Sequence, residues 1–156
     1  YILWSLCRGL PYRGNNNEKW AVALGGGGNH RMGLYDMVML KDNHVDFAGG
    51  IKASVARTKA YLAQTNRMLA IEVETRNLQE VKEALQAGVD RIMLDNFTVS
   101  ATKEAVEYIA GRTEVESSGG ITRHTLVPYA ECGVDYISVG ALTHHIKGLD
   151  MSLKAL

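Results

Sequence analysis

Charged and hydroxyl side chains follow five apolar runs in the sequence, where the carboxyl end of a buried strand is expected. They are Lys41-Asp42, Glu72 with Glu74, Asp95-Asn96, Glu116-Ser117-Ser118 and Ser138. Strands of a parallel sheet are buried on both faces and nearly all apolar, so polar residues at every strand end need a reason. In β/α barrels the carboxyl ends of the strands form the active-site face. The pattern therefore predicts a catalytic site there. The structural alternative is that Glu72, Glu74 and Glu116 form ion pairs with Lys or Arg inside a barrel mouth.

A group of potential cations surrounds one loop and one strand end: His30, Arg31 and Lys41. Arginine offers a planar fork that matches carboxylate or phosphate, and histidine can be charged or neutral near pH 7. The chain as a whole has no net charge, with 17 basic and 17 acidic residues, so this local excess of cations predicts an anionic ligand. His44 and His124 stand apart from the group and are expected to be surface or packing residues.

Two glycine turns follow the last two apolar runs, Ser117-Ser118-Gly119-Gly120 and Gly140-Ala141. Glycine lets backbone amides approach an anion closely, and the start of the following helix adds a favourable dipole. Phosphate sites of barrels also gather after the final strands, so the turns predict a phosphate site that His144 can reach. Ordinary tight strand-to-helix turns are the alternative. The run from Gly25 to Gly28 is expected to end a short helix.

The carboxylates of the strand ends also bear on metal binding. Neither H-E-x-x-H nor C-x-x-C occurs in the sequence, which argues against a tightly held zinc ion. Carboxylates beside a phosphate site instead predict Mg²⁺ that arrives with the substrate.

The elements that must position these residues alternate between strand and helix. Apolar, β-branched or Met-rich runs predict strands over 37–41, 69–74, 91–95, 113–118 and 135–139, and the segments between them have helical spacing. The expected helix ends carry capping residues: Asn77 with Glu80, Thr98, Gly88, Gly111 and Gly133. Pro128 fits the first turn of a helix that begins near Thr125 or Leu126.

The spacing of the strand ends predicts the architecture. From Glu74 onward they recur about every 22 residues, which matches one strand, one helix and two short turns. Such units build parallel sheets, and the G-x-G-x-x-G fingerprint of an open nucleotide-binding sheet is absent. A β/α barrel is therefore favoured. A complete eight-unit barrel needs roughly 200 residues or more, so the fold class is α/β with an incomplete barrel.

Composition excludes several classes of function. The chain has 156 residues, of which 46% are hydrophobic and 22% charged, as in an ordinary globular domain. Zero net charge gives no basic stripe for nucleic acid or an anionic membrane, and a mean hydropathy of −0.10 without a long apolar run excludes a membrane-spanning helix. Residues 1–20 show no export signal. Two cysteines, Cys7 and Cys132, favour a reducing, cytoplasmic compartment.

Several of these motifs together resemble the quinolinate phosphoribosyltransferases, also called nicotinate-nucleotide pyrophosphorylases (carboxylating). The matching segments are Gly25-Gly26-Gly27-x-Asn29-His30-Arg31-x-Gly33-Leu34-Tyr35-Asp36-Met37, Lys41-Asp42-Asn43-His44, Glu72-Val73-Glu74, Leu94-Asp95-Asn96, Glu116-Ser117-Ser118-Gly119-Gly120-Ile121 and Gly140-Ala141-Leu142-Thr143-His144. The resemblance runs from about Glu18 to Leu156. Residues 1–17 look unlike the family, so the chain divides into an atypical N-terminal segment, 1–17, and a partial barrel domain, 18–156.

The resemblance implies a glycosyltransferase (pentosyltransferase) of de novo NAD biosynthesis. Such an enzyme joins quinolinate to phosphoribosyl pyrophosphate with Mg²⁺, and releases nicotinate mononucleotide, pyrophosphate and carbon dioxide. It also implies a homodimer or a higher homo-oligomer.

The family pattern assigns roles to individual residues. His30, Arg31 and Lys41 would hold the carboxylates of quinolinate. Glu74 and Asp95 would bind the ribose hydroxyls or Mg²⁺ and stabilise the positive charge on the ribose, with Glu72 a weaker candidate. Ser118, Gly119, Gly140 and His144 match the positions that take up the 5′-phosphate. Lys41, Glu74 and Asp95 are the residues expected to be catalytic.

The sequence departs from the family at its start. The family's N-terminal α/β sandwich domain and the Thr-Arg-Lys-Thr motif of the first barrel strand are not present, and only Arg8 or Arg13 lies near enough to substitute for that motif. The family dimer also borrows a basic residue from its neighbour's N-terminal domain. This chain alone is therefore expected to be inactive or very weak. Two alternatives stay open: a paralogue with a different acceptor, against which His30, Arg31 and Lys41 argue, and a non-catalytic remnant that binds phosphate.

Overall fold

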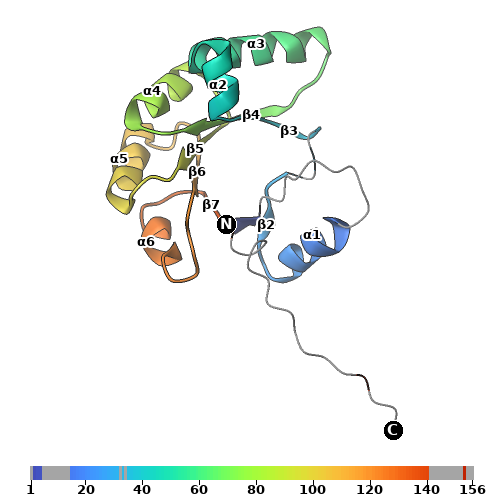
Figure 1. Ribbon diagram of the computed structural model, residues 1–156, viewed down its shortest axis with the longest axis vertical. Coiled ribbons are helices and arrows are strands. Elements are labelled where there is room, and N and C mark those ends of the chain that lie inside the picture. Colours follow the sequence, from blue (N-terminus) through green and yellow to red (C-terminus); the bar gives the residue numbers. More distant parts are fainter. Residues whose placement is uncertain (1, 5–14, 32, 34, 141–152, 154–156) are drawn as a thin grey trace.

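The polar strand ends belong to one parallel sheet of seven strands. The computed structural model describes residues 2–4, 15–31, 33, 35–140 and 153 (Figure 1). The strands are β1 (Ile2–Trp4), β2 (Gly28–Asn29), β3 (Met37–Leu40), β4 (Ala70–Thr75), β5 (Arg91–Asp95), β6 (Glu114–Ser118) and β7 (Tyr136–Ser138). Their order across the sheet is β2-β1-β7-β6-β5-β4-β3, and every neighbouring pair is parallel.

This order is that of a barrel opened at one seam. Strands that follow one another in the chain lie side by side from β3 to β7, and β1 pairs with both β2 and β7. Among the described strands, only the consecutive pair β2 and β3 is unpaired, and these two form the edges of the curved sheet (Figure 1). The predicted incomplete β/α barrel is confirmed.

The sequence predicted five strands rather than seven. β1 and β2 were missed because they contain three and two residues, too few for a recognisable pattern. β1 also lies within residues 1–17, the segment expected to be atypical, yet it pairs with β7 in register Ile2 to Ile137.

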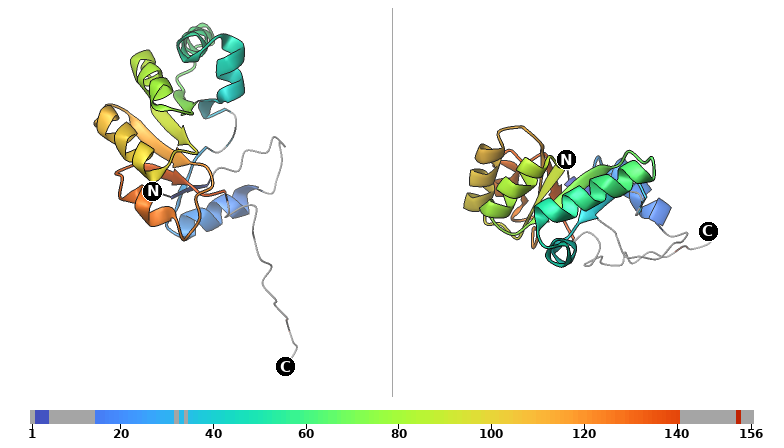
Figure 2. Two further views of the ribbon diagram at one scale, coloured as in Figure 1. Left: turned by 60° about the vertical axis from the view of Figure 1, so that its left-hand side comes forward. Right: turned by 90° about the horizontal axis from the view of Figure 1, so that it is seen from above.

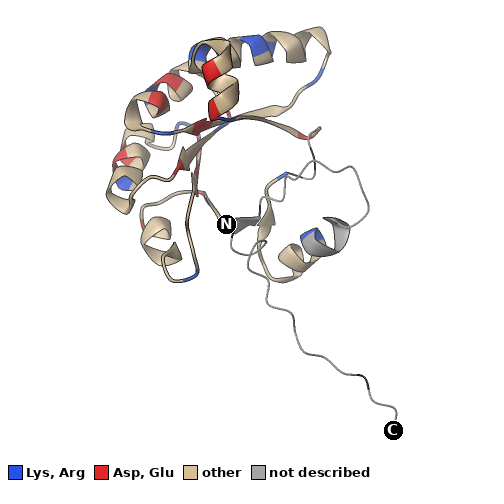
Figure 3. Cartoon of the chain, in the orientation of Figure 1, with Lys and Arg blue, Asp and Glu red and all other residues tan. Residues whose placement is uncertain are grey.

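The helices lie outside the curved sheet. They are α1 (Asn15–Leu24), α2 (Asp42–Ala48), α3 (Ile51–Gln64), α4 (Leu78–Ala87), α5 (Val99–Ile109) and α6 (Leu126–Ala130). Figure 1 and the left view of Figure 2 show α3, α4 and α5 on the outer side of the sheet. Acidic and basic residues are interspersed along α4 and α5, whereas α3 carries only basic ones (Figure 3). Within the described ranges, no helix is both long and apolar enough to span a lipid bilayer.

The apolar core fills the space between the sheet and the outer helices. One face of the central strands contributes Val73, Ile92, Leu94 and Val115, and the helices contribute Val55, Val81, Ala105 and Ile109. Side chains alternate along a strand, so the residues between these apolar ones point to the inner face of the curved sheet.

Most of the predicted helix ends are confirmed. The Asn77 side chain accepts a hydrogen bond from the Glu80 amide at 3.0 Å, but the Glu80 carboxylate accepts from the Arg76 amide rather than from Asn77. Thr98 accepts from the Ala101 amide at 3.2 Å. The helix with Pro128 begins at Leu126, so the proline lies in its first turn as expected.

The glycine run after α1 also ends a helix as predicted. The amides of Gly25 and Gly27 donate to the carbonyls of Ala21 and Val22 at 3.0 and 2.9 Å. These bonds satisfy carbonyls that the helix end leaves without a helical partner.

Two aspartates in matching Gly-Val-Asp sequences, Asp90 and Asp135, attach the start of one strand to the next, a feature not predicted from the sequence. The Asp90 amide donates to the Ile71 carbonyl at 3.0 Å, and its carboxylate accepts from the Ile71 amide at 2.8 Å. Asp135 makes the same two bonds to Val115 at 3.0 and 2.8 Å. The repeated strand and helix unit therefore repeats its hydrogen bonds as well.

We predict that Asp90→Ala lowers the free energy of unfolding by about 1–3 kcal/mol, because the partly buried Ile71 amide loses its acceptor. Asp90→Asn keeps a side-chain oxygen at this position and serves as the matched control. Urea unfolding of both variants and the parent chain measures the difference. Equal stability of Asp90→Ala and Asp90→Asn would contradict the role assigned to this carboxylate.

Candidate active site

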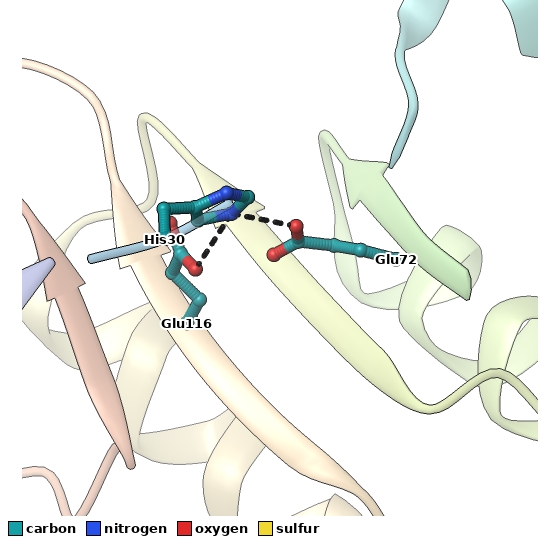
Figure 4. Close-up of side chains that lie close together, drawn as sticks. All are labelled: His30, Glu72 and Glu116. Atoms are coloured by element: carbon teal, nitrogen blue, oxygen red, sulfur yellow. Dashed lines mark ion pairs between the residues drawn. The ribbon is translucent and has the colours of Figure 1, made fainter. Parts of the chain in front are cut away.

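A buried group of three ionisable side chains lies on the inner face of the sheet. His30 follows β2, Glu72 belongs to β4 and Glu116 to β6. His30 Nε2 lies 2.8 Å from Glu72 Oε2 and 3.4 Å from Glu116 Oε2, and Figure 4 shows both carboxylates directed at this nitrogen. All three side chains are fully buried. We call these residues the inner cluster.

Strand register explains why the inner cluster forms. Glu72 lies beside Arg91 on β5, and Glu116 lies beside Met93 two residues further along the same strand. These residues therefore share the inner face, whereas Val73 and Ile92 between them enter the apolar core. The curvature of the sheet turns β4 and β6 toward the same interior, where His30 enters from β2.

The inner cluster fixes the charge of His30. Burial alone would lower the pKa of this imidazole, but its contacts with Glu116 and Glu72 outweigh burial and raise the pKa to about 9. Contacts from His30 and Ser138 overcome the opposing effect of burial and lower the pKa of Glu116, whereas burial raises that of Glu72. These contacts favour the charged imidazolium form of His30.

The inner cluster also offers three ligand atoms close enough for a metal ion, all within 4.8 Å of one another. One contact favours an ion pair over a metal: Arg91 Nη1 lies 3.4 Å from Glu116, so a guanidinium already faces this carboxylate. The arrangement supports an ion-pair cluster.

The loop that carries His30 and Arg31 is anchored by groups that sequence reasoning did not identify. The buried Lys19 of α1 donates to the Arg31 carbonyl at 2.6 Å, and Asn29 donates to the Lys19 carbonyl at 3.1 Å. Arg31 itself donates from Nη1 to the Met37 carbonyl at the start of β3, 3.3 Å away. The predicted cationic loop is thus held against both α1 and β3.

Lys41, the third predicted cation, follows β3 and is the N-cap residue of α2. Its backbone amide donates to His44 Nδ1 at 3.0 Å, so His44 helps to shape the start of α2. This contact agrees with the structural role expected for His44.

The predicted acidic residues Glu74 and Asp95 lie near the carboxyl ends of β4 and β5. Glu74 is level with Met93, and Asp95 is level with Ser118. Burial raises the pKa of Glu74, the negative charge of Asp95 raises it further, and the Lys41 ammonium opposes both effects. These three predicted catalytic residues therefore share one electrostatic neighbourhood.

Gly119 adopts a left-handed backbone conformation with φ of +95°. A Cβ at this position would lie 2.6 Å from both the backbone nitrogen and Cγ of Asn96, so glycine is required by the close approach of Asn96. This is a structural reason for a glycine that the sequence assigned to phosphate binding. Gly140 ends the described stretch, and His144 lies outside the described residues.

Comparison with known proteins places this geometry in a family. The family model "Quinolinate phosphoribosyl transferase, C-terminal domain" matches residues 15–154. The chain belongs to the quinolinate phosphoribosyltransferase family. The nicotinate-nucleotide pyrophosphorylase [carboxylating], chloroplastic, of Arabidopsis thaliana is 50% identical over 152 residues, which cover 88% of this chain and 44% of that protein. The probable nicotinate-nucleotide pyrophosphorylase [carboxylating] of Methanocaldococcus jannaschii is 43% identical over 143 residues, 87% of this chain and 49% of that protein.

A solved structure agrees with these relatives. NadC from Streptococcus pyogenes superposes with a TM-score of 0.84 and 39% identity, over 99% of this chain and 52% of that one. The family resemblance inferred from the sequence is confirmed. The chain spans less than half the length of the curated relatives described above.

Two residues of this quinolinate phosphoribosyltransferase barrel escaped sequence reasoning. Arg91, at the start of β5, contacts Glu114 at 2.8 Å and Glu116 at 3.4 Å, and stacks on the Tyr136 ring. Asn96 was noted only as part of a motif, yet it contacts Asp95 directly. An arginine within an otherwise apolar strand was the available indication for Arg91.

We predict that His30 titrates near pH 9 in the folded chain, because two buried carboxylates stabilise its charged form. NMR of the imidazole measures this pKa, and Glu116→Gln should lower it by removing one carboxylate. The raised folded pKa means that the stabilisation is complete below the unfolded pKa of about 6.5 and is lost as the pH rises through about 9.

His30→Gln provides the control, since it removes the titrating group. Compared with the parent chain, this variant should show a flatter dependence of unfolding free energy on pH between about 6.5 and 9. A His30 pKa below 7 in the parent chain would contradict the predicted imidazolium.

Proposed function

We propose that this chain is the barrel part of an enzyme that transfers the phosphoribosyl group of phosphoribosyl pyrophosphate to quinolinate. Decarboxylation then gives nicotinate mononucleotide, pyrophosphate and carbon dioxide, a step of NAD biosynthesis. The observation that carries the proposal is the arrangement of side chains: the buried His30 between two carboxylates, the Arg31 loop held against β3, and Glu74 with Asp95 and Lys41 as its charged neighbours. Relatives that match most of this chain carry the name of this activity.

His30, Arg31 and Lys41 are proposed to hold the two carboxylates of quinolinate. A guanidinium binds a carboxylate in a planar fork, and an imidazolium adds a charge-assisted donor. His30 Nδ1 is buried and makes no hydrogen bond within the described residues, so a ligand carboxylate at this nitrogen would remove the cost of an unsatisfied donor. These contacts would hold the pyridine nitrogen beside the ribose carbon, which is catalysis by orientation.

Glu74 and Asp95 are proposed to face the ribose. As pyrophosphate leaves, positive charge develops on the sugar, and two carboxylates at fixed positions stabilise it. Their oxygens also suit Mg²⁺, a hard cation that prefers carboxylate and phosphate ligands. Burial and then the negative charge of Asp95 raise the pKa of Glu74, and a bound cation would oppose both effects. When bound, Mg²⁺ would neutralise charge on the departing pyrophosphate.

The amides of the turns at Ser118-Gly119 and Gly140 are proposed to bind the 5′-phosphate, with His144 as a further contact. The left-handed conformation of Gly119 supports this role, because such turns direct successive amides to one side. After transfer, the pyridinium ring itself would stabilise the carbanion that decarboxylation leaves.

The remaining parts of the proposal concern the assembly and its location. We propose a homodimer or a higher homo-oligomer without nucleic-acid or membrane partners, and a cytoplasmic location. Sedimentation would test the oligomeric state, and cell fractionation would test the location. Fractionation is needed because the relative from Arabidopsis thaliana is described as chloroplastic and one from Nicotiana glauca as mitochondrial.

Calorimetric titration of this chain with quinolinate and with Mg²⁺ and phosphoribosyl pyrophosphate tests the proposed function. We expect both compounds to bind. Lys41→Ala should weaken the binding of quinolinate about 10- to 100-fold, since a charge-assisted contact contributes about 1.5–3 kcal/mol. Lys52→Ala, an exposed change on the outer helix α3, is the matched control and should bind normally. Binding of the phosphate compound alone would instead favour a different acceptor or a non-catalytic remnant.

We further predict that this 156-residue chain transfers the phosphoribosyl group very weakly or not at all. The physical reason is that these residues contain no Thr-Arg-Lys-Thr motif, whose basic side chains would contact substrate by the family pattern. A coupled assay for nicotinate mononucleotide measures the rate. Turnover comparable to that of a full-length family member would show that the present residues are sufficient.

A further inference from the structure

Asn96 connects two parts of the proposed active site. It follows β5 in a left-handed backbone conformation, with φ of +54°. Its side-chain Nδ2 donates to Asp95 Oδ2 at 2.8 Å, and its backbone amide donates to the Ser118 carbonyl at 2.9 Å. One residue therefore contacts both the predicted acidic group and the predicted phosphate turn.

The second connection is steric. Because a Cβ on Gly119 would lie only 2.6 Å from Asn96 Cγ, the side chain of Asn96 occupies the space that any larger residue at 119 would need. This close approach and the backbone hydrogen bond from Asn96 to Ser118 both restrict the separation between the end of β5 and the turn after β6.

Asparagine suits both the left-handed backbone at this position and the hydrogen bond to Asp95. Asparagine tolerates the left-handed region better than most residues, and its amide supplies the donor that a carboxylate neighbour requires. Aspartate would also tolerate the backbone, but it would place a second carboxylate 2.8 Å from Asp95. Glycine would keep the backbone and lose the donor.

We infer that Asn96 is a positioning residue that fixes the orientation of the Asp95 carboxylate and its separation from the Ser118-Gly119 turn. The ligand that benefits, phosphoribosyl pyrophosphate, rests on the proposed function. By this inference Asp95 at the end of β5 binds the sugar, the Ser118-Gly119 turn binds the 5′-phosphate of the same substrate, and Asn96 sets the distance between these two segments. Asn96 itself need not touch the substrate.

The orientation of Asp95 can be measured without any ligand. Three-bond NMR couplings report its χ1 rotamer, and we expect one rotamer in the parent chain and averaged rotamers in Asn96→Gly. Asn66→Gly is a matched control, because Asn66 is also left-handed, with φ of +50°, in the turn after α3. A single unchanged Asp95 rotamer in Asn96→Gly would overturn the inference.

Ligand affinity provides the second readout. Asn96→Gly should weaken the binding of phosphoribosyl pyrophosphate with Mg²⁺ about 10- to 100-fold, the usual effect of removing a residue that orients a ligating group. Asn96→Asp should weaken this binding further. The affinity for quinolinate should not change in either variant, and Asn66→Gly should bind both compounds as the parent chain does. Undiminished affinity in Asn96→Gly would overturn the inference. If the parent chain binds neither compound, the proposed function fails for this chain, and the Asp95 rotamers still decide whether Asn96 acts as a positioning residue.

Discussion

The burial of two carboxylates inside the curved sheet is the constraint on which the arrangement of the site depends. Glu72 and Glu116 are fully buried, and an uncompensated charge there would cost several kcal/mol. His30 faces both carboxylates and Arg91 contacts Glu116, so two cations offset that cost. Because His30 belongs to the loop after β2, the same ion pairs hold one edge of the sheet against its centre. The carboxylates of Glu72 on β4 and Glu116 on β6 thus hold the His30 loop in position through ion pairs.

The structural interpretation of the polar strand ends is confirmed for the deeper residues, and the chemical interpretation stays a prediction for the residues nearer the carboxyl ends. Glu72 and Glu116 lie deeper and form the ion pairs expected of the structural alternative, although with His30 as well as an arginine. Glu74 and Asp95 lie nearer the carboxyl ends, beside the Lys41 ammonium. The deeper ion pairs favour the charged form of His30 and hold it in place, and His30 is proposed to bind substrate. The buried ion pairs therefore support the proposed binding site.

The sequence predicted the parts of the fold that repeat. Strands β4 to β7 and the helices between them recur with one period, β3 is a clear apolar run, and the capping residues Asn77 and Thr98 act locally. These features can therefore be recognised without tertiary information. β1 and β2 could not be predicted, because two or three residues become a strand only through pairing with a distant neighbour. The burial of His30 was unpredictable for the same reason: a cation in a glycine-rich loop looks exposed until β4 and β6 supply its partners.

The open seam gives Arg31 a role in the fold in addition to its proposed role in binding. β2 and β3 are the two edges of the sheet, and no backbone hydrogen bond pairs them as strands among the described residues. Arg31 follows β2 and donates its guanidinium to the Met37 carbonyl at the first residue of β3, so a side chain bridges the seam where a barrel would have a backbone ladder. This contact fixes the distance between the two edges. A planar guanidinium with five donors suits such a bridge better than the point charge of a lysine ammonium.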